Sequence, residues 1–423
     1  MMAFLYPFLV LLQPGILWPA LQPYKPILIT SAVAGIWALA MRRRSPGLLG
    51  RYFRHPAFIG LCVFFVVQVA SVAYAGVQGM IEEWDFWDNY VLFVAISLLL
   101  IRDVAAARRY VWGMLAGGSV VVGYGLWAVA THSPTLPGGR AGAYGMYENH
   151  NDYTFIILTI LPPAWIFLRH YRQLWIKFLR WTLMAACIAG VLLSLSRGGI
   201  LVLVFDLALI VWFSGTGTRR ALTLALLGII GTAAVVYQFQ ARELNQQGVY
   251  SEEQAKSSRY ELWNAAENMV IRHPILGVGS RRFQEFAQGY GHISHDNRGK
   301  VAHNTYLEIA ADSGLSGILS FLFMIRAVAR SVRPQARETR SDGLDALRRA
   351  TFITLIGILF RSLLDAKATD WSFYLLVTLG VAVSGLETES SPAADAPAVP
   401  LGRQADRPAE KTSPRPAVYG RRR

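Results

Sequence analysis

Long apolar runs alternate with short polar connections along most of the chain. A helix that spans a bilayer needs about 20 mostly apolar residues, and fewer where protein covers its ends. By this criterion the chain contains about twelve spans. They cover residues 4–20, 27–41, 57–75, 89–101, 110–130, 153–168, 181–195, 199–213, 221–238, 305–326, 350–366 and 370–386. The pattern predicts an all-α, polytopic membrane protein.

Basic residues gather in every second connection between these runs. Most of the 41 Lys and Arg residues lie in five such connections and in the C-terminal tail. The intervening connections are poor in them, and residues 76–88 are acidic and rich in tryptophan, as at a membrane interface. Because Lys and Arg are enriched in cytoplasmic loops, this alternation predicts cytoplasmic N- and C-termini in a bacterial inner membrane.

The composition agrees with the membrane class. Hydrophobic residues make up 53% of the chain and charged residues 16%, whereas soluble domains carry about a quarter charged residues. The net charge of +14 is divided among short clusters and forms no basic patch between aromatic residues, so nucleic acid is not an expected partner. Two cysteines, Cys62 and Cys187, are too few for a disulfide framework or a zinc site.

The predicted domains follow from the spans and the charges. Residues 1–238 hold nine spans and residues 305–386 hold three, while 387–423, rich in Pro, Ala and charge, are expected to be a disordered cytoplasmic tail. The N-terminus lacks a basic stretch and a cleavage site, which favours a retained first helix over a signal peptide. Residues 239–304 then form a periplasmic loop domain with a helix over 256–272, capped by Ser258 and Glu261.

Several arginines are candidates for function on the periplasmic side. Arg197, in SLSRGG, lies between two apolar runs, and an arginine at membrane depth is costly and by default functional. The alternative is an arginine that extends to the interface. Arg259 opens the predicted loop helix, where a solvated surface residue is equally expected. Arg281 and Arg282 follow a Gly-x-Gly turn that lacks the strand and spacing of a dinucleotide loop.

A histidine precedes the tenth span. The imidazole of His303 titrates near neutrality and can take a proton from an attacking hydroxyl, although a histidine that only caps a helix is the simpler interpretation. Thr305 and Glu308 resemble a second capping box. Asn304, Glu308 and Asp312 recur every four residues and give the predicted helix one polar face.

Two short turns complete the candidate set. Asp365 lies between the last two spans with Lys367 and Asp370, and could orient the histidine, pair with an arginine, or be an ordinary loop carboxylate. The Asn149–Asn151 segment is explained by turn chemistry. No two of these His and Asp residues share a recognised metal-ligand spacing, so neither a metal site nor a cofactor is predicted.

Arginines and a histidine on the outer side of a membrane suit one kind of substrate. Guanidinium groups bind diphosphate oxygens bidentately and remain charged. A lipid-linked sugar diphosphate presents its phosphates at that depth, and diphosphate leaves readily when fixed cations match its developing charge. A neutral histidine could then deprotonate an acceptor sugar hydroxyl, without a metal.

Several segments also resemble one family. The pattern HN-x9-G-x2-G, formed by His303, Asn304, Gly314 and Gly317, is similar to the signature of the O-antigen ligases. SRYELW, HPILGVGSRRF, AHNTYLEIAADSGLSGILSFL and SLSRGG resemble further blocks of the wider O-antigen ligase/polymerase superfamily. The resemblance covers roughly residues 190–325 by motif and the whole chain by architecture.

The resemblance implies a reaction and roles for particular residues. Arg197 and Arg259 correspond to diphosphate-binding arginines and His303 to the catalytic histidine, while Asp365 corresponds to an acidic residue near the end. With Asn304 and Arg282 they form the expected substrate-binding set.

The implied activity is transfer of O-antigen polysaccharide from undecaprenyl diphosphate to lipid A-core, without metal or cofactor. An O-antigen polymerase or a protein O-oligosaccharyltransferase is the alternative enzyme. A lipid-linked oligosaccharide flippase is the alternative from another class, although the candidates gather on one side of the membrane and thereby favour catalysis.

Overall fold

The computed structural model describes residues 1–41, 47–133, 139–214, 217–245, 252–334, 342–366 and 370–386, and within them every regular element is helical. The first half comprises α1 Met2–Leu12, α2 Pro14–Leu17, η1 Pro19–Tyr24, α3 Pro26–Met41, α4 Leu48–Phe53, α5 Pro56–Tyr74, α6 Val77–Leu100, α7 Val104–Ala130, η4 Gly145–Tyr147, α8 His150–Arg169 and α9 Leu174–Leu193. The second half comprises α10 Arg197–Ser214, α11 Gly217–Asn245, α12 Glu252–Arg272, α13 Phe283–Tyr290, η5 His295–Asn297, α14 Thr305–Val332, α15 Asp342–Ser362 and α16 Trp371–Leu386.

Many of these helices are suited to a bilayer. Six described helices are long and apolar enough to cross a membrane: α5, α7, α8, α9, α10 and α14. Shorter apolar helices are α1, α3, α16 and the Asn89–Leu100 part of α6. The all-α, polytopic class predicted from the sequence is confirmed. The predicted tail, 387–423, lies outside the described residues.

Three predicted boundaries were wrong. The span 4–20 breaks at Gln13, whose φ of 49° is left-handed, and Pro14 then opens α2 because proline cannot donate to the preceding turn. Residues 77–88, expected to belong to a connection, form the first half of α6. The loop helix begins at Glu252, six residues before Ser258, so Ser258 is not its cap.

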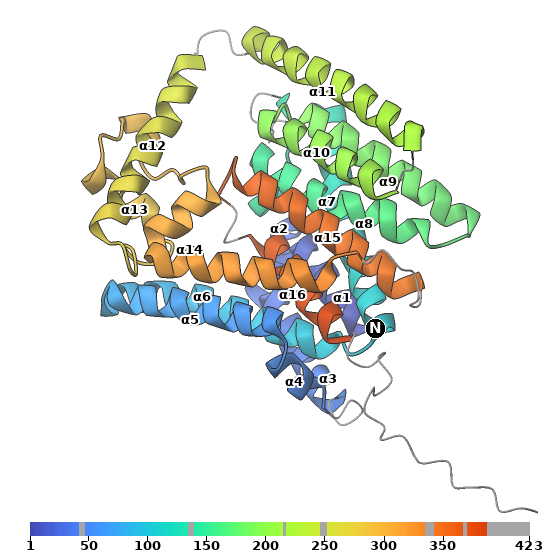
Figure 1. The fold of residues 1–423 in the computed structure, drawn as a ribbon, viewed down its shortest axis with the longest axis horizontal. Helices are drawn as coiled ribbons and strands as arrows, with labels where there is room; N and C mark the ends of the chain where they lie inside the picture. Colours follow the sequence, from blue (N-terminus) through green and yellow to red (C-terminus); the bar gives the residue numbers. More distant parts are fainter. Residues whose placement is uncertain are drawn as a thin grey trace, which may run out of the picture.

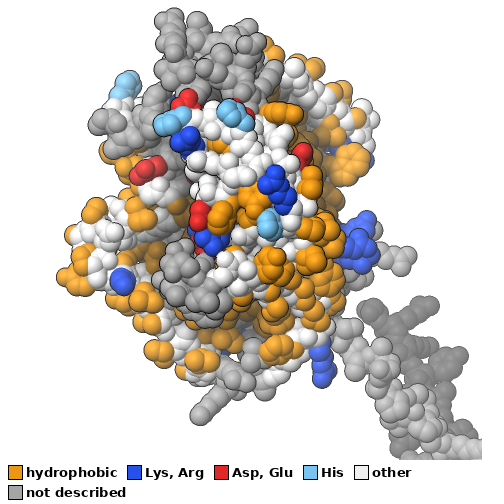
Figure 2. All heavy atoms as spheres, turned by 90° about the vertical axis from the view of Figure 1, so that its left-hand side faces the viewer, with side chains coloured by type: hydrophobic (Ala, Val, Ile, Leu, Met, Phe, Trp, Pro, Cys, Tyr) orange, Lys and Arg blue, Asp and Glu red, His pale blue; other side chains and the backbone are white. Residues whose placement is uncertain are grey.

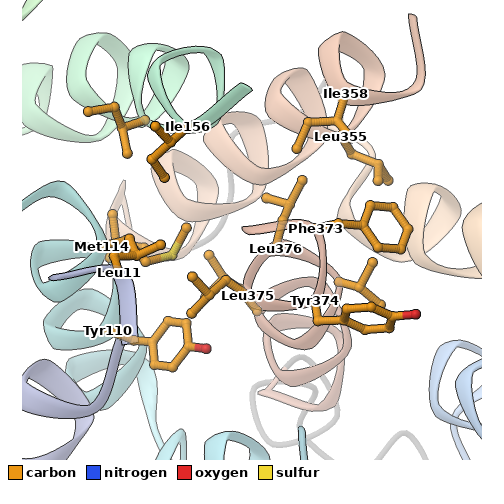
Figure 3. Packing of buried hydrophobic residues seen from close by; sticks show 14 of the residues in the cluster. Leu11, Tyr110, Met114, Ile156, Leu355, Ile358, Phe373, Tyr374, Leu375 and Leu376 are labelled. Atoms are coloured by element: carbon orange, nitrogen blue, oxygen red, sulfur yellow. The ribbon is translucent and has the colours of Figure 1, made fainter. Parts of the chain in front are cut away.

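The last helix is the centre of the membrane domain. Every residue of α16 from Ser372 to Leu386 is buried, and α16 contacts α1, α6, α7, α14 and α15. Figure 3 shows Leu375 and Leu376 of α16 pointing among apolar side chains of α1, α7, α8 and α15. A helix that is apolar on all sides is suited to such a central position.

Close backbone contacts hold neighbouring helices together. A Cβ at Gly117 of α7 would lie 2.9 Å from the Leu11 Cβ of α1, and one at Gly60 of α5 would lie 2.9 Å from the Met324 Cα of α14. Because lipid tails are as apolar as the side chains, helices in a membrane associate mainly through such packing. Glycine is therefore required at both positions.

The loop helices form a separate layer at one end of the molecule. Figure 1 shows α12 and α13 beside one end of α5, α6 and α14, and the N-terminus toward the opposite end. A small apolar core joins them, with Leu262 and Met269 from α12, Phe283 and Ala287 from α13, and Ala311 from α14. The loop domain is thus anchored on the first turns of α14.

The helix α14 is broken at Gly314, with φ 64° and ψ −161°. A Cβ there would collide with the carbonyl group of Ile275. The break frees the Leu315 amide to donate to the Pro274 carbonyl at 2.7 Å and the Ser316 amide to donate to the Ile275 carbonyl at 3.2 Å. Gly314 therefore joins the loop to the membrane helix, and the predicted span 305–326 consists of two helical segments.

Candidate active site

The backbone of His303 is held in a strained conformation. Its φ is 52°, in the left-handed region that residues other than glycine seldom adopt. Such a conformation costs on the order of 1–3 kcal/mol and persists only where the surroundings enforce it. The residues on either side of His303 provide that enforcement.

The peptide groups of Ala302 are bound on both sides. Its amide donates to Glu308 Oε2 at 2.8 Å, and its carbonyl accepts the indole N–H of Trp263 at 2.8 Å. Ala302 is fully buried, so neither group can turn to water instead. We call this arrangement of Trp263, Ala302 and Glu308 the Ala302 clamp. It fixes the chain immediately before His303.

The chain after His303 is fixed by Asn304 and Thr305. Asn304 is the N-cap of α14, because its Oδ1 accepts the amides of Tyr306 at 3.0 Å and Leu307 at 3.2 Å. The predicted capping box was therefore displaced by one residue, and the Glu308 carboxylate reaches back to Ala302 rather than to the cap. Thr305 donates to the carbonyl of Asp365 through both its hydroxyl, at 2.8 Å, and its amide, at 3.2 Å.

Asp365 meets the histidine side chain. Its Oδ1 lies 3.2 Å from His303 Nδ1, and its side chain is only 5% exposed, against 27% for His303. An ionised carboxylate only accepts hydrogen bonds, so it selects the tautomer in which Nδ1 carries the proton. The Nε2 lone pair is then the one that can accept a proton. Of the three roles left open for Asp365, the geometry supports orientation of His303 and pairing with an arginine.

That arginine is Arg361, which the sequence analysis missed. Its side chain is 2% exposed, and Nη2 lies 3.4 Å from Asp365 Oδ2 and 3.4 Å from the Asn151 carbonyl oxygen. A buried cation beside a buried carboxylate favours the ionised form of both. Arg361 falls inside the predicted span 350–366, so the rule that singled out Arg197 would also have singled it out.

The residues on either side of Arg197 place the chain in the same region. It is the first residue of α10, and Ser196 before it donates to the Asn151 side chain at 2.8 Å. After it, a Cβ at Gly198 would lie 2.5 Å from Arg361 Nη1. Arg140 steadies the preceding turn, donating to the Ser194 carbonyl at 2.9 Å. The chain immediately after Arg197 is thus packed against Arg361.

Arg259 reaches the site from the loop domain. Its Nη2 lies 3.5 Å from the carbonyl oxygen of Leu364, the residue before Asp365. Four of the predicted residues, Arg197, Arg259, His303 and Asp365, are therefore grouped around the turn 361–365.

Arg282, also predicted to bind substrate, forms an ion pair with Glu285 at 2.8 Å, and its guanidinium lies over the Phe286 ring. Its role in binding stays a prediction, and Lys367 lies outside the described residues.

The predicted polar face of α14 binds backbone amides, and the role of Asn304 in substrate binding stays a prediction. Asp312, 6% exposed, accepts the Phe283 amide at 2.7 Å and the Arg281 amide at 3.0 Å. Asn304 caps the helix and Glu308 holds Ala302. The four-residue spacing thus places three acceptors where the loop between α12 and α14 passes.

Figure 2 looks onto the end of the molecule that carries the loop domain. Arginine, acidic and histidine side chains gather on this face, and hydrophobic side chains cover much of the surface around it. Such a surface suits a substrate with an anionic head and an apolar tail. Among the described residues, no three His, Cys, Asp or Glu side chains form a group that could hold a metal ion.

A comparison with protein-family models adds independent support. A model described as O-antigen ligase matches residues 182–322, from α9 into α14. This segment is therefore similar to the O-antigen ligase family. It includes Arg197, Arg259 and His303, whereas Asp365 and Arg361 lie beyond it in the chain. A search of curated proteins finds no match to the chain.

The contacts in the structure also identify residues whose roles a motif alone does not reveal. Asn151 had been attributed to turn chemistry, and Asn149 does cap its amide at 2.8 Å, yet Asn151 also binds Ser196 and Arg361. Trp263 ends the SRYELW segment, and its indole N–H holds the Ala302 carbonyl. Both contacts join segments far apart in sequence, so no local pattern signals them.

Proposed function

We propose that the protein is an O-antigen ligase that transfers O-antigen polysaccharide from undecaprenyl diphosphate to lipid A-core. The observation that carries the proposal is the His303–Asp365 pair, set among Arg197, Arg259 and Arg361 within and beside the segment similar to the O-antigen ligase family. The site faces the periplasm and both termini face the cytoplasm of an inner-membrane protein.

The donor binds through its diphosphate. Arg197 comes from a membrane helix and Arg259 from the loop domain, and both lie near the turn 361–365, which supports a diphosphate site formed by the two. The fixed guanidinium groups offset the negative charge that grows on the leaving diphosphate. No metal ion is required for this, because arginine forks supply the positive charge.

The acceptor is activated by His303. The hydroxyl oxygen of a lipid A-core sugar attacks the anomeric carbon of the donor, and its proton passes to His303 Nε2. The new glycosidic bond forms as the bond from that carbon to the diphosphate oxygen breaks, releasing undecaprenyl diphosphate. Asp365 holds the imidazole in the required tautomer and stabilises the imidazolium that results.

Electrophoresis of lipopolysaccharide from cells that depend on this protein tests the proposal. Loss of the gene, or replacement by His303→Ala, should leave bare lipid A-core and accumulated lipid-linked polymer, while the variant still inserts into the membrane. Core that bears a single repeat unit would instead identify a polymerase. Transfer by the purified enzyme in detergent, which has no second compartment, excludes a flippase.

A further inference from the structure

Two adjoining hollows lie at the end of the membrane domain away from the loop domain. One, of about 330 Å³, lies between the C-terminal ends of α8 and α10 and the start of α15. The other, of about 680 Å³, lies between α7 and the turn that joins α8 to α9. Arg169 and His170 line both. We call the two together the Arg169 hollow.

The Arg169 hollow carries an excess of positive charge. Arg108, Arg169, Arg172 and Arg349 line it, against the single carboxylate of Asp345. In the described part of the chain, Arg108, Arg169 and Arg172 form no ion pair with a carboxylate, and the buried Nε of Arg108 has no hydrogen-bond partner. The Arg108 guanidinium lies directly against Gly343 of α15, where the missing Cβ leaves room for it.

The Arg169 hollow lies at the depth of one surface of the bilayer. Asn151 contacts Arg361 at one end of α8, and Arg169 ends the same helix eighteen residues later. At 1.5 Å per residue these points are about 27 Å apart, close to the roughly 30 Å thickness of the hydrocarbon layer. If the catalytic site lies at one surface of the bilayer, the Arg169 hollow lies at the other.

Aromatic side chains beside the hollow mark the same level. The Trp112 indole donates to the Tyr171 hydroxyl at 3.2 Å, and Trp175, next to them, is 62% exposed. Exposed tryptophan and tyrosine are enriched where lipid headgroups meet the hydrocarbon. The Arg169 hollow is therefore at the depth of lipid phosphates.

We propose that the Arg169 hollow binds the phosphodiester headgroup of an anionic phospholipid from the leaflet opposite the catalytic site. Arginine forks match the geometry of phosphate oxygens, and basic pockets between membrane helices bind such headgroups. Free phosphate shares this chemistry, but it lacks the acyl chains that the neighbouring apolar helix surfaces would hold. The lipid is therefore the occupant.

The test uses the full-length protein in neutral detergent with phosphatidylglycerol, phosphatidylcholine or inorganic phosphate added. Native mass spectrometry measures bound lipid, and the thermal midpoint in phosphatidylcholine checks that each variant is folded. The double variant Arg169→Gln/Arg172→Gln removes two basic residues, each of which contributes ~1 kcal/mol to binding at an anionic membrane surface. Because 1.4 kcal/mol corresponds to a tenfold change in affinity, the variant should bind phosphatidylglycerol about 30-fold more weakly. Both residues are exposed, so folding should be unaffected.

The control is Arg219→Gln/Arg220→Gln, which removes the same charge at the start of α11, outside the hollow. It should retain wild-type binding of phosphatidylglycerol. Equal losses in both pairs would mean that charge at this surface acts diffusely, and would overturn the proposal. Equal stabilisation by inorganic phosphate and phosphatidylglycerol would overturn the assignment to a lipid.

Discussion

His303 Nδ1 and Asp365 Oδ1 lie 3.2 Å apart, although 62 residues separate them in the chain. The contact joins the loop domain, through the strained backbone before α14, to the turn between α15 and α16. Arg361 approaches the other oxygen of the same carboxylate. A single aspartate therefore connects the proposed base to a buried cation.

Replacing Asp365 with Asn should impair chemistry more than donor binding. The amide cannot stabilise an imidazolium, and its NH2 group can favour the wrong histidine tautomer, so kcat should fall about 10²–10⁴-fold, the range of general acid–base catalysis. Single-turnover assays with purified enzyme measure this, with donor affinity determined separately. A variant with wild-type kcat would show that His303 needs no carboxylate partner.

Replacing Arg197 with Lys should weaken donor binding. A point charge cannot form the paired hydrogen bonds of a guanidinium, and hydrogen bonds to charged groups contribute about 1.5–3 kcal/mol, or roughly 10–100-fold in affinity. Titration with undecaprenyl diphosphate measures the change, with Arg219→Lys as the matched control. Unchanged affinity in the Arg197 variant would contradict diphosphate binding at this residue.

The Ala302 clamp predicts a role for Trp263 in positioning His303. Trp263→Phe keeps an aromatic ring but leaves the buried Ala302 carbonyl without its donor, at a cost of about 1–3 kcal/mol. We expect kcat to fall about tenfold, since 1.36 kcal/mol corresponds to that factor, while the donor KM is unchanged. Trp181→Phe, on the exposed surface of α9, is the control. A raised KM with unchanged kcat would assign Trp263 to binding instead.

The loop domain should loosen in acid through Glu261. Burial opposes ionisation, but hydrogen bonds from Ser294 and Asn297 outweigh it and lower the pKa of Glu261 below its usual value. Because the folded state holds the ionised form, its stabilising effect is complete above the ordinary pKa of about 4.3 and is lost as the pH falls through the lowered value.

Hydrogen exchange of residues 291–298, expressed as protection factors, measures this effect. Protection should fall below about pH 4, on the basis of the ordinary glutamate pKa. Glu261→Gln should abolish that pH dependence, whereas Glu267→Gln on the same helix should leave it intact. Identical profiles for the two variants would show that another group is responsible.

Metal removal should leave transfer unaffected. Arginines supply the positive charge at the proposed diphosphate site, so activity in EDTA should equal activity without it. The measurement is the initial rate of transfer by purified enzyme before and after chelation. A loss of activity restored by added Mg²⁺ would contradict an arginine-only mechanism.

The sequence by itself determined the membrane class, the approximate positions of most helices, and Arg197, Arg259 and His303 as candidates. These conclusions follow from local properties of the sequence. A run of about 20 apolar residues is long enough to span a bilayer, and a charged or titratable residue beside such a run is easily recognised. Helix boundaries were less certain where polar helices continue beyond the apolar run, as in α6 and α12.

Only the tertiary structure decided which groups act together. The roles of Arg361, Asn151 and Trp263 follow from their contacts with Asp365, Ser196 and Ala302, although Arg361 lies in an apolar run and Trp263 in the SRYELW segment. The same is true of Gly314, whose contact with the Ile275 carbonyl no sequence pattern indicates. Hydrogen bonds and close contacts depend on distance in space, and sequence spacing specifies that distance only within one helix or turn.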